Sequence, residues 1–366
     1  QELINKEKKL KFFKTHNIYG SLDQSEFSNK YNSIGAVYII RDPRNVITSI
    51  SNHFEMNKEE ALDFMQNEKK FTYDYFKKND YSDFQFIGSW EKNYKSWINN
   101  NDFPVKLIKY EDLTNQTFNV VKELKKIIKT YKIIVTKSTV PVTTGDKIEN
   151  ILARLKKNKL VDVVSNPEFL REGEAIRDFI YPDRVVVGTN SKKANKILQS
   201  LYLPIIKKKN KYFNTSRRGA ELIKYASNAF LATKISYINE LANLCEKTGV
   251  DIKDVSIGIG SDQRIGERFL RAGPAYGGSC FPKDTRALSD TAKKFKSNLS
   301  IVDTVIKSNE NRKKLLIKKI DKILKGKIKN KVITFLGVTF KPNTDDMREA
   351  SSIPMIKYLN KKKCTI

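Results

Sequence analysis

A glycine pair followed by a cysteine is the feature of this sequence that most directly indicates chemistry. Gly277 and Gly278 let the backbone approach a ligand closely, and they precede Cys280, Lys283 and Asp284. We expect Cys280 to begin a helix, where backbone N–H groups and nearby cations favour the thiolate over the thiol. A thiolate in such a place is a nucleophile. The alternative, an inert buried cysteine, is the commoner fate of cysteines in general.

A cation and an amide lie on one predicted helix. Residues 221–245 show apolar side chains at helical spacing, and Lys224 and Asn228 are four residues apart, so they project from one face. Such a lysine is either part of an exposed stripe or a functional cation. Cys245, on the same helix, is expected in the core, whereas Cys364 near the end of the chain is expected to be exposed.

Carboxylates and hydroxyls follow predicted strands. Residues 131–136 form an apolar strand that ends in a hydroxyl-rich turn, and residues 161–165 form another, followed by Glu168 and Glu172. A third strand is expected at 184–188. Strand, helix and strand indicate a parallel α/β sheet with chemistry at its carboxyl edge. Solvated surface carboxylates remain the alternative.

These segments together are very similar to the UDP-glucose 6-dehydrogenases, of the UDP-glucose/GDP-mannose dehydrogenase family, over about residues 131–366. Dehydrogenases of GDP-mannose and UDP-N-acetylmannosamine share this plan, but residues 227–230 and 279–282 look closer to the UDP-glucose branch. The matching segments are 137–141, 166–173, 183–184, 224–228, 262–266, 277–284, 335–341 and 348–352.

The resemblance implies that UDP-glucose is oxidised to UDP-glucuronate with two NAD, through a thiohemiacetal and then a thioester on Cys280. Lys224 and Asn228 would stabilise the oxyanion, Asp284 would orient water and Glu168 would be the base for thioester hydrolysis. It further implies substrate contacts by Glu172, Arg264, Phe269, Arg271 and Lys341, with Arg264 reaching into a neighbouring subunit, and NAD contacts by Thr139, Lys283 and Arg348.

One expected element of a dinucleotide fold does not occur in these 366 residues. A GxGxxG turn between a strand and a helix should hold the pyrophosphate, yet the only G-x-G, at 258–260, follows a helical segment. We therefore expect the first half of the NAD domain and most of the UDP-binding domain to be missing, and the activity to be impaired. The alternative is an inactive chimeric fragment that keeps a helical association core.

The first part of the chain carries a different pattern. Residues 36–40 read as a buried strand and 41–50 as a turn and helix, in which Arg41 and Ser49 can form an anion site. With Lys14 and His16 before and 88–90, 97 and 105–113 after, residues 8–127 resemble sulfotransferases that use the sulfate donor PAPS. The resemblance implies that Arg41 and Ser49 hold the 3′-phosphate of PAPS, His16 is the general base and Lys14 steadies the sulfonate.

Composition and charge narrow the possible partners and the possible cellular location. Lys and Arg total 69 against 41 Asp and Glu, a net charge of +28, but lysines scattered along the chain predict neither a nucleic-acid partner nor a membrane partner. The three cysteines form no metal or disulfide pattern, which indicates a reducing, cytoplasmic location and no metal site. The sequence begins with Gln, and both ends look cut.

The predicted fold class is α/β. We expect a partial sulfotransferase-like P-loop-type unit at 1–128, a partial NAD-binding Rossmann domain at 129–210, a central helical domain at 211–310 and the start of a UDP-binding α/β domain at 320–366. The central helices are expected to form a homodimer.

Overall fold

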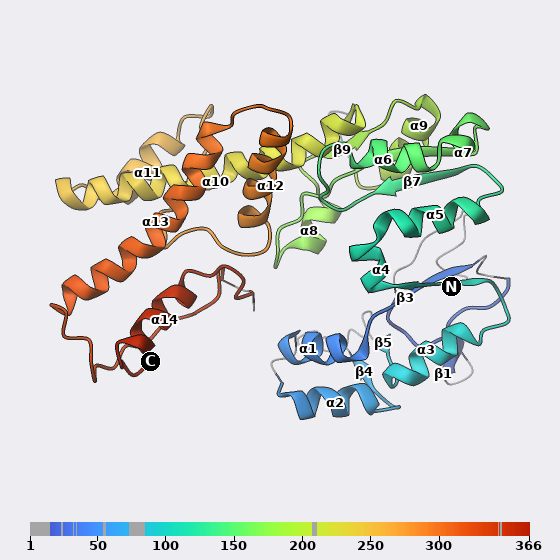
Figure 1. The fold of residues 1–366 in the computed structure, drawn as a ribbon, viewed down its shortest axis with the longest axis horizontal. Helices are drawn as coiled ribbons and strands as arrows, with labels where there is room; N and C mark the ends of the chain where they lie inside the picture. Colours follow the sequence, from blue (N-terminus) through green and yellow to red (C-terminus); the bar gives the residue numbers. More distant parts are fainter. Residues whose placement is uncertain are drawn as a thin grey trace. The chain divides into compact units, whose positions relative to one another are not determined.

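The computed structural model describes residues 15–22, 25–31, 33, 35–53, 56–72, 85–206, 211–342, 344 and 346–366. The chain divides into two compact units, residues 1–127 and 128–366, and each is described by itself. Figure 1 labels their helices and strands.

The first unit is built around a pair of parallel strands. β3 (Ala36–Ile40) pairs with β6 (Val105–Lys109) in parallel, and α1 (Pro43–His53) follows β3 directly, which confirms the predicted strand, turn and helix. The prediction that this strand is buried is wrong, because Val37 and Ile39 on one face of the two-stranded sheet are more than half exposed. The proline lies in the first helical turn, where its missing N–H costs nothing. The other elements are β1 (Ser21–Leu22), β2 (Ser25–Glu26), α2 (Lys58–Gln66), β4 (Phe71–Thr72), β5 (Gln85–Phe86), α3 (Trp90–Ile98), α4 (Tyr110–Asn115) and α5 (Thr117–Ile127).

The second unit opens with a four-stranded sheet in the order β10-β9-β8-β7. Its strands are β7 (Lys132–Thr136), β8 (Val161–Ser165), β9 (Val185–Gly188) and β10 (Tyr212–Thr215), connected by α6 (Thr144–Ile151), α7 (Ala153–Lys157), α8 (Ala175–Ile180) and α9 (Lys192–Tyr202). All residues of β8 and β9 are buried, and α9 packs on them through Ala194 and Leu198. The predicted strands at 131–136, 161–165 and 184–188 are thus confirmed within a residue or so.

The prediction of a parallel sheet is confirmed for β7 and β8 and is wrong for β9. β7 runs parallel to β8 and β9 parallel to β10, but β8 and β9 are antiparallel, with Ser165 opposite Gly188. A parallel crossover would need a helix packed on the sheet, whereas α8 buries no residue. The chain instead turns back beside β8, and Asn166 Nδ2 donates to the Val186 carbonyl at 2.7 Å.

The second half of this unit is helical. α10 (Arg217–Thr248) runs from the sheet to α11 (Ile252–Gly260), as Figure 1 shows, and packs on α12 (Phe281–Lys294) and α13 (Ser300–Ile323). Ser216 caps its start by accepting from Gly219 N, and Gly249 ends it with a left-handed φ of 76°. The helix predicted at 221–245 is therefore confirmed and is longer than expected.

The last segment packs back on α13. α14 (Ser352–Lys361) and the bridge between Val332 and Thr365 enclose a small core of Ile328, Leu359 and Cys364. Cys364 is buried, and its Sγ lies 3.0 Å from the Lys331 carbonyl, so the expectation that it is exposed is wrong.

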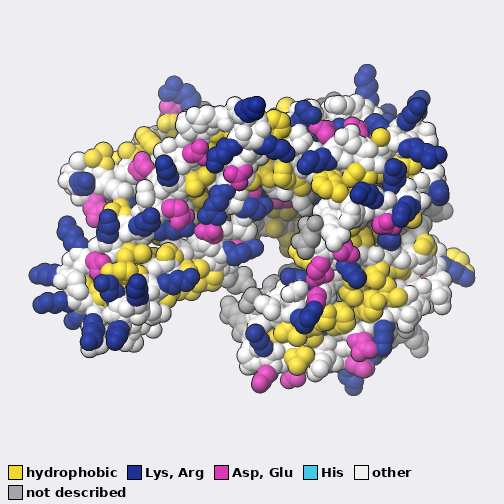
Figure 2. All heavy atoms as spheres, in the orientation of Figure 1, with side chains coloured by type: hydrophobic (Ala, Val, Ile, Leu, Met, Phe, Trp, Pro, Cys, Tyr) yellow, Lys and Arg dark blue, Asp and Glu magenta, His cyan; other side chains and the backbone are white. Residues whose placement is uncertain are grey.

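Basic side chains are dispersed. In Figure 2, Lys and Arg are spread over the visible face among apolar and acidic side chains. Within the described part of the chain, no helix combines the length and apolar character needed to cross a membrane.

Candidate active site

Cys280 lies at the start of α12. It is exposed and occupies the N-cap position, and Pro282 lies in the first turn. The preceding loop is tight: Gly278 has a left-handed φ of 78°, and a Cβ there would lie 2.7 Å from the Phe340 ring. Only glycine fits this position without strain. The predicted placement of the cysteine at a helix start is confirmed.

Asn228 and Asp284 join α10 to α12 beside that cysteine. Both side chains are buried, and Asn228 Nδ2 donates to Asp284 Oδ2 at 2.6 Å. Asp284 Oδ1 lies 3.2 Å from Lys283 Nζ but makes no hydrogen bond with any residue that the structure describes. A buried carboxylate oxygen without a hydrogen bond is free to accept one from water or substrate.

Lys224 is buried one turn before Asn228 on α10. Its side chain is only 4% exposed, and its Nζ lies 3.4 Å from Glu168 Oε1. The Phe169 ring lies 5.3 Å from the same ammonium. A buried cation needs such a partner to offset its lost hydration, so the structure brings together two of the predicted catalytic residues.

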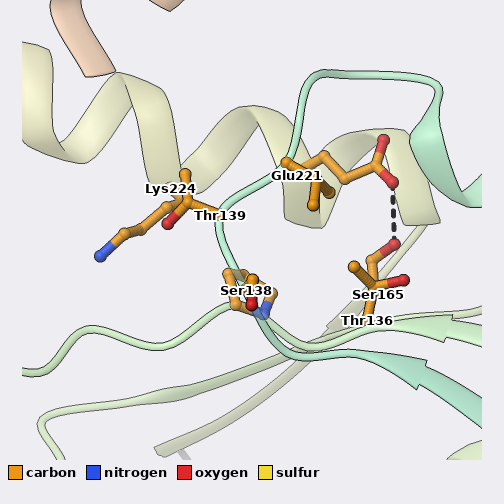
Figure 3. A pocket seen from close by; sticks show the side chains of 8 residues that line it. Thr136, Ser138, Thr139, Ser165, Glu221 and Lys224 are labelled. Atoms are coloured by element: carbon orange, nitrogen blue, oxygen red, sulfur yellow. Dashed lines mark hydrogen bonds between the residues drawn. The ribbon is translucent and has the colours of Figure 1, made fainter. Parts of the chain in front are cut away.

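A small hollow separates α10 from the ends of β7 and β8. Figure 3 shows Glu221 and Lys224 on α10 facing the loop that carries Ser138 and Thr139, with Ser165 at the end of β8. The hollow has room for about one water molecule. Thr139 therefore lines the same space as Lys224.

Glu221 is a residue of this site that the sequence reasoning missed. It is 3% exposed and accepts from Thr143 N and Gly145 N, both at 2.8 Å, and from Ser165 Oγ at 3.0 Å. Burial raises its pKa, while these hydrogen bonds act in the opposite direction. By capping α6, it fixes the loop of Thr139 against α10.

Lys341 and Arg348 come from the segment before α14. Lys341 Nζ donates to the Glu172 carbonyl at 2.9 Å, and Arg348 Nη2 lies 3.9 Å from the Glu172 carboxylate. Arg348 also makes two hydrogen bonds of 2.8 Å to Asp346, which hold the pKa of that carboxyl below its usual range. Glu172, Lys341 and Arg348 therefore gather at one place.

Three predicted substrate residues lie on the loop between α11 and α12. Phe269 has a left-handed φ of 68°, uncommon for a non-glycine residue, and its ring lies 6.1 Å from that of Phe281, next to Cys280. Arg271 is exposed. The Arg264 side chain is 90% exposed and pairs with Asp262 at 2.6 Å. Substrate contacts by these residues stay predictions.

The candidates of the first unit lie on separate elements. Lys14 is outside the described residues; His16 is exposed, and its carbonyl accepts from Asn93 Nδ2 at 3.0 Å. Arg41 lies over the Tyr110 ring at 4.9 Å, and its buried Nε has no hydrogen-bond partner in the described structure. Ser49 is exposed on α1. Their predicted roles toward PAPS stay predictions.

Comparison with known proteins assigns this sheet, with its helices that carry a lysine, an amide and a cysteine, to a class of nucleotide-sugar dehydrogenases. Residues 97–206 match the NAD binding domain of the UDP-glucose/GDP-mannose dehydrogenase family, 218–311 its central domain and 334–366 its UDP binding domain. Through these domains the chain belongs to the UDP-glucose/GDP-mannose dehydrogenase family. The NAD-domain match begins at residue 97, earlier than the resemblance predicted from 131.

Similar proteins include curated UDP-glucose 6-dehydrogenases. That of Rhizobium meliloti is 47% identical over 244 residues, 66% of this chain and 56% of the relative, and that of Rickettsia felis is 51% identical over 228 residues, 62% and 50%. The chain thus spans about half the length of these relatives. A solved UDP-glucose dehydrogenase from Pyrobaculum islandicum superposes with a TM-score of 0.66 and 25% identity, covering 91% of this chain and 81% of that one.

NAD is the cofactor that this family implies, and the residues present fit part of it. A hydroxyl at Thr139 and cations at Lys283 and Arg348 suit the amide and anionic groups of a dinucleotide. The hollow beside Thr139, however, has room for only about one water molecule, so it does not by itself enclose a dinucleotide.

Proposed function

We propose that this protein catalyses a UDP-glucose 6-dehydrogenase reaction, in which the primary alcohol of UDP-glucose becomes the carboxylate of UDP-glucuronate. The observation that carries the proposal is an exposed Cys280 at a helix start, four residues before the buried Asp284 that bonds to Asn228, with Lys224 and its partner Glu168 one helical turn from Asn228. A cysteine is useful here because it traps the aldehyde between the two oxidations.

The proposed reaction passes through two covalent intermediates on Cys280. The Cys280 thiolate adds to the aldehyde carbon to form a thiohemiacetal. Loss of a hydride and of the hydroxyl proton leaves a thioester, and water releases the carboxylate and the thiol. NAD, when bound, accepts the hydride in each oxidation. Thr139, Lys283 and Arg348 are the residues proposed to hold it.

The geometry supports the proposed oxyanion site. An amide nitrogen carries two hydrogens, and Asn228 uses one on Asp284, so the other can donate to the substrate oxygen. Lys224 adds a buried positive charge, which acts strongly in a site that excludes water. Glu168 lies beside that ammonium, where it can receive a proton from the water that attacks the thioester.

The test is to incubate the chain with UDP-glucose and NAD and to follow the near-ultraviolet absorbance of NADH. We expect two NADH for each UDP-glucuronate, and none from Cys280→Ser. Absence of NADH from folded wild-type protein at saturating NAD would support the alternative, an inactive chimeric fragment that keeps the helical core. Oxidation that is unaffected by Cys280→Ser would refute the proposed covalent step.

Homodimerisation through the central helices is part of the proposal. Phe230, Tyr237 and Leu244 follow one another at seven-residue intervals on α10 and are each more than half exposed. Seven residues make about two helical turns, so the three side chains form one apolar stripe. A stripe of this kind marks an association surface when it is contiguous.

The first unit has a second candidate function, PAPS-dependent sulfotransfer. The observation favouring it is Arg41, whose buried Nε lacks a hydrogen-bond partner in the described structure and which lies where β3 leads into α1. A phosphate at a helix start would supply the missing acceptor. Consumption of PAPS in the absence of NAD, lost in Arg41→Gln, would support this function; no consumption with a panel of hydroxyl acceptors would count against it.

A further inference from the structure

The segment before α14 covers the loop that leads to Cys280. Gly278 N donates to the Arg348 carbonyl at 2.7 Å, and the Phe340 ring packs where a Gly278 side chain would lie. Phe340 N in turn donates to the Asp346 carbonyl at 3.1 Å, which closes this segment on itself. The loop before Cys280 is therefore held from outside by residues about seventy positions further along the chain.

Glu349 ties this segment to two helices at once. Its Oε1 accepts from Arg286 Nη1 on α12 at 3.0 Å, and its Oε2 lies 3.5 Å from Lys313 Nζ on α13. The Lys313 side chain is only 7% exposed, so this ammonium depends on its carboxylate partners. The hydrogen bond from Arg286 is the main reason that the pKa of Glu349 is lowered.

The backbone of Glu349 is also constrained. Its backbone φ of 55° lies in the left-handed region, which residues other than glycine and asparagine rarely adopt. Its carbonyl oxygen would lie 2.7 Å from a Cβ at Gly277, so the two chain segments touch directly. A disfavoured conformation persists only when surrounding contacts hold it, and the two ion pairs of Glu349 are such contacts.

Arg348 is the charged group that this arrangement brings to the cysteine. Its guanidinium is fixed by Asp346, whose hydrogen bonds raise the pKa of Arg348, and the negative charge of a Cys280 thiolate acts in the same direction. The Arg348 carbonyl accepts from Gly278 N, two residues before Cys280, so this cation lies on the segment that covers the cysteine loop. A positive charge held there attracts an anionic reagent toward the thiol. Its position depends on the residue that follows it in the chain.

We propose that Glu349 is a positioning residue for the cysteine: by clamping its segment to α12 and α13, it holds the Arg348 guanidinium beside Cys280. The proposal rests on Cys280 as the reacting group of the proposed function. Its test measures the thiol directly and needs no turnover, so failure of the dehydrogenase activity and failure of the clamp give different results.

The experiment compares two alkylating reagents on the intact chain. Iodoacetate is an anion and iodoacetamide is neutral, so the ratio of their rate constants at Cys280, read by peptide mass mapping, reports the local positive charge rather than accessibility. Cys245 and Cys364 are buried, and their labelling in the same samples would reveal unfolding.

We expect Glu349→Gln to lower the iodoacetate to iodoacetamide ratio at Cys280 about fivefold, as the loss of a nearby cation should. Arg348→Gln should lower it at least as much. Glu310→Gln is the matched control, because Glu310 also pairs with Lys313, at 2.9 Å, but lies on α13 and should leave the ratio within about a factor of two.

The direction in which the iodoacetate to iodoacetamide ratio changes distinguishes a positioning role of Glu349 from a direct effect of its charge. Glu349→Gln removes a negative charge, which on its own would raise the ratio, so a rise or no change would overturn the proposal. If this variant exposes Cys245 and Cys364 to label, Glu349→Asp decides instead. The shorter side chain keeps the charge but cannot span both partners, and an unchanged ratio there would equally overturn the clamp.

Discussion

Gly188 offers a sharp test of how the sheet is joined to the helices that carry the candidate site. It ends β9 against the first turn of α10, and a Cβ there would lie 2.6 Å from Ala220 Cβ, 2.7 Å from Ser216 O and 2.8 Å from Arg217 Cα. These atoms belong to the backbone or to a methyl group and cannot rotate away. Gly188→Ala must therefore push β9 and α10 apart by about 1 Å to restore ordinary contact distances.

The expected change in the free energy of unfolding is the sum of two opposing effects. Overpacking a close contact destabilises a protein by about 1–3 kcal/mol, whereas replacing glycine by alanine restricts the unfolded chain and recovers about 0.4–1 kcal/mol. The net loss should be about 1–2 kcal/mol. For a unit of this size, that lowers the midpoint of thermal unfolding by about 2–8 °C.

Thermal unfolding followed by circular dichroism measures this loss, and Gly258→Ala is the matched control. Gly258 lies inside α11, and a Cβ there meets nothing within 4 Å, so alanine should stabilise the helix by about 0.5–1 kcal/mol. Opposite shifts of the two midpoints are expected. Equal shifts would refute the inferred close contact between β9 and α10.

Three further outcomes are expected. At neutral pH, iodoacetamide should label Cys280 at least tenfold faster than the buried Cys245 and Cys364, as read by mass mapping; equal rates would mean that the loop is not assembled. Phe230→Lys should convert a dimer to a monomer in light scattering, and an unchanged mass would exclude α10 as the interface. The pKa of Asp346 is lowered by its arginine partner, so this pair stabilises the fold above the ordinary carboxyl pKa of about 4, and the stabilisation is lost as pH falls below it. The hydrogen-exchange protection factors of residues 338–342 and 346–350 should fall there before those of α10.

The sequence was sufficient for the elements with strong local patterns. Continuous apolar runs predicted β8 and β9, and helical spacing predicted α10 with Lys224 and Asn228 on it. The glycine pair predicted that Cys280 starts a helix, because glycine there serves both the turn and the close packing. These features are set by residues close together in the chain, so the local sequence pattern predicts them.

Features set by distant contacts could not be predicted in this way. The pattern of β9 is the same whether the strand runs parallel or antiparallel to β8, since burial on both faces carries no direction. Glu221 looks like an ordinary helix residue until Thr143 N, Gly145 N and Ser165 are seen around it. Cys364 is buried only because the chain end returns to Lys331.

The continuity of α10 has a consequence for how the second unit unfolds. Ala220 packs on β9 and Asn228 bonds to α12, and these two residues, eight positions apart, are about 12 Å from each other along one uninterrupted helix. Neither the sheet nor the helices can separate without breaking backbone hydrogen bonds of α10. Residues 128–366 should therefore lose structure cooperatively, as a single folding unit, with the candidate active site at the point that both halves share.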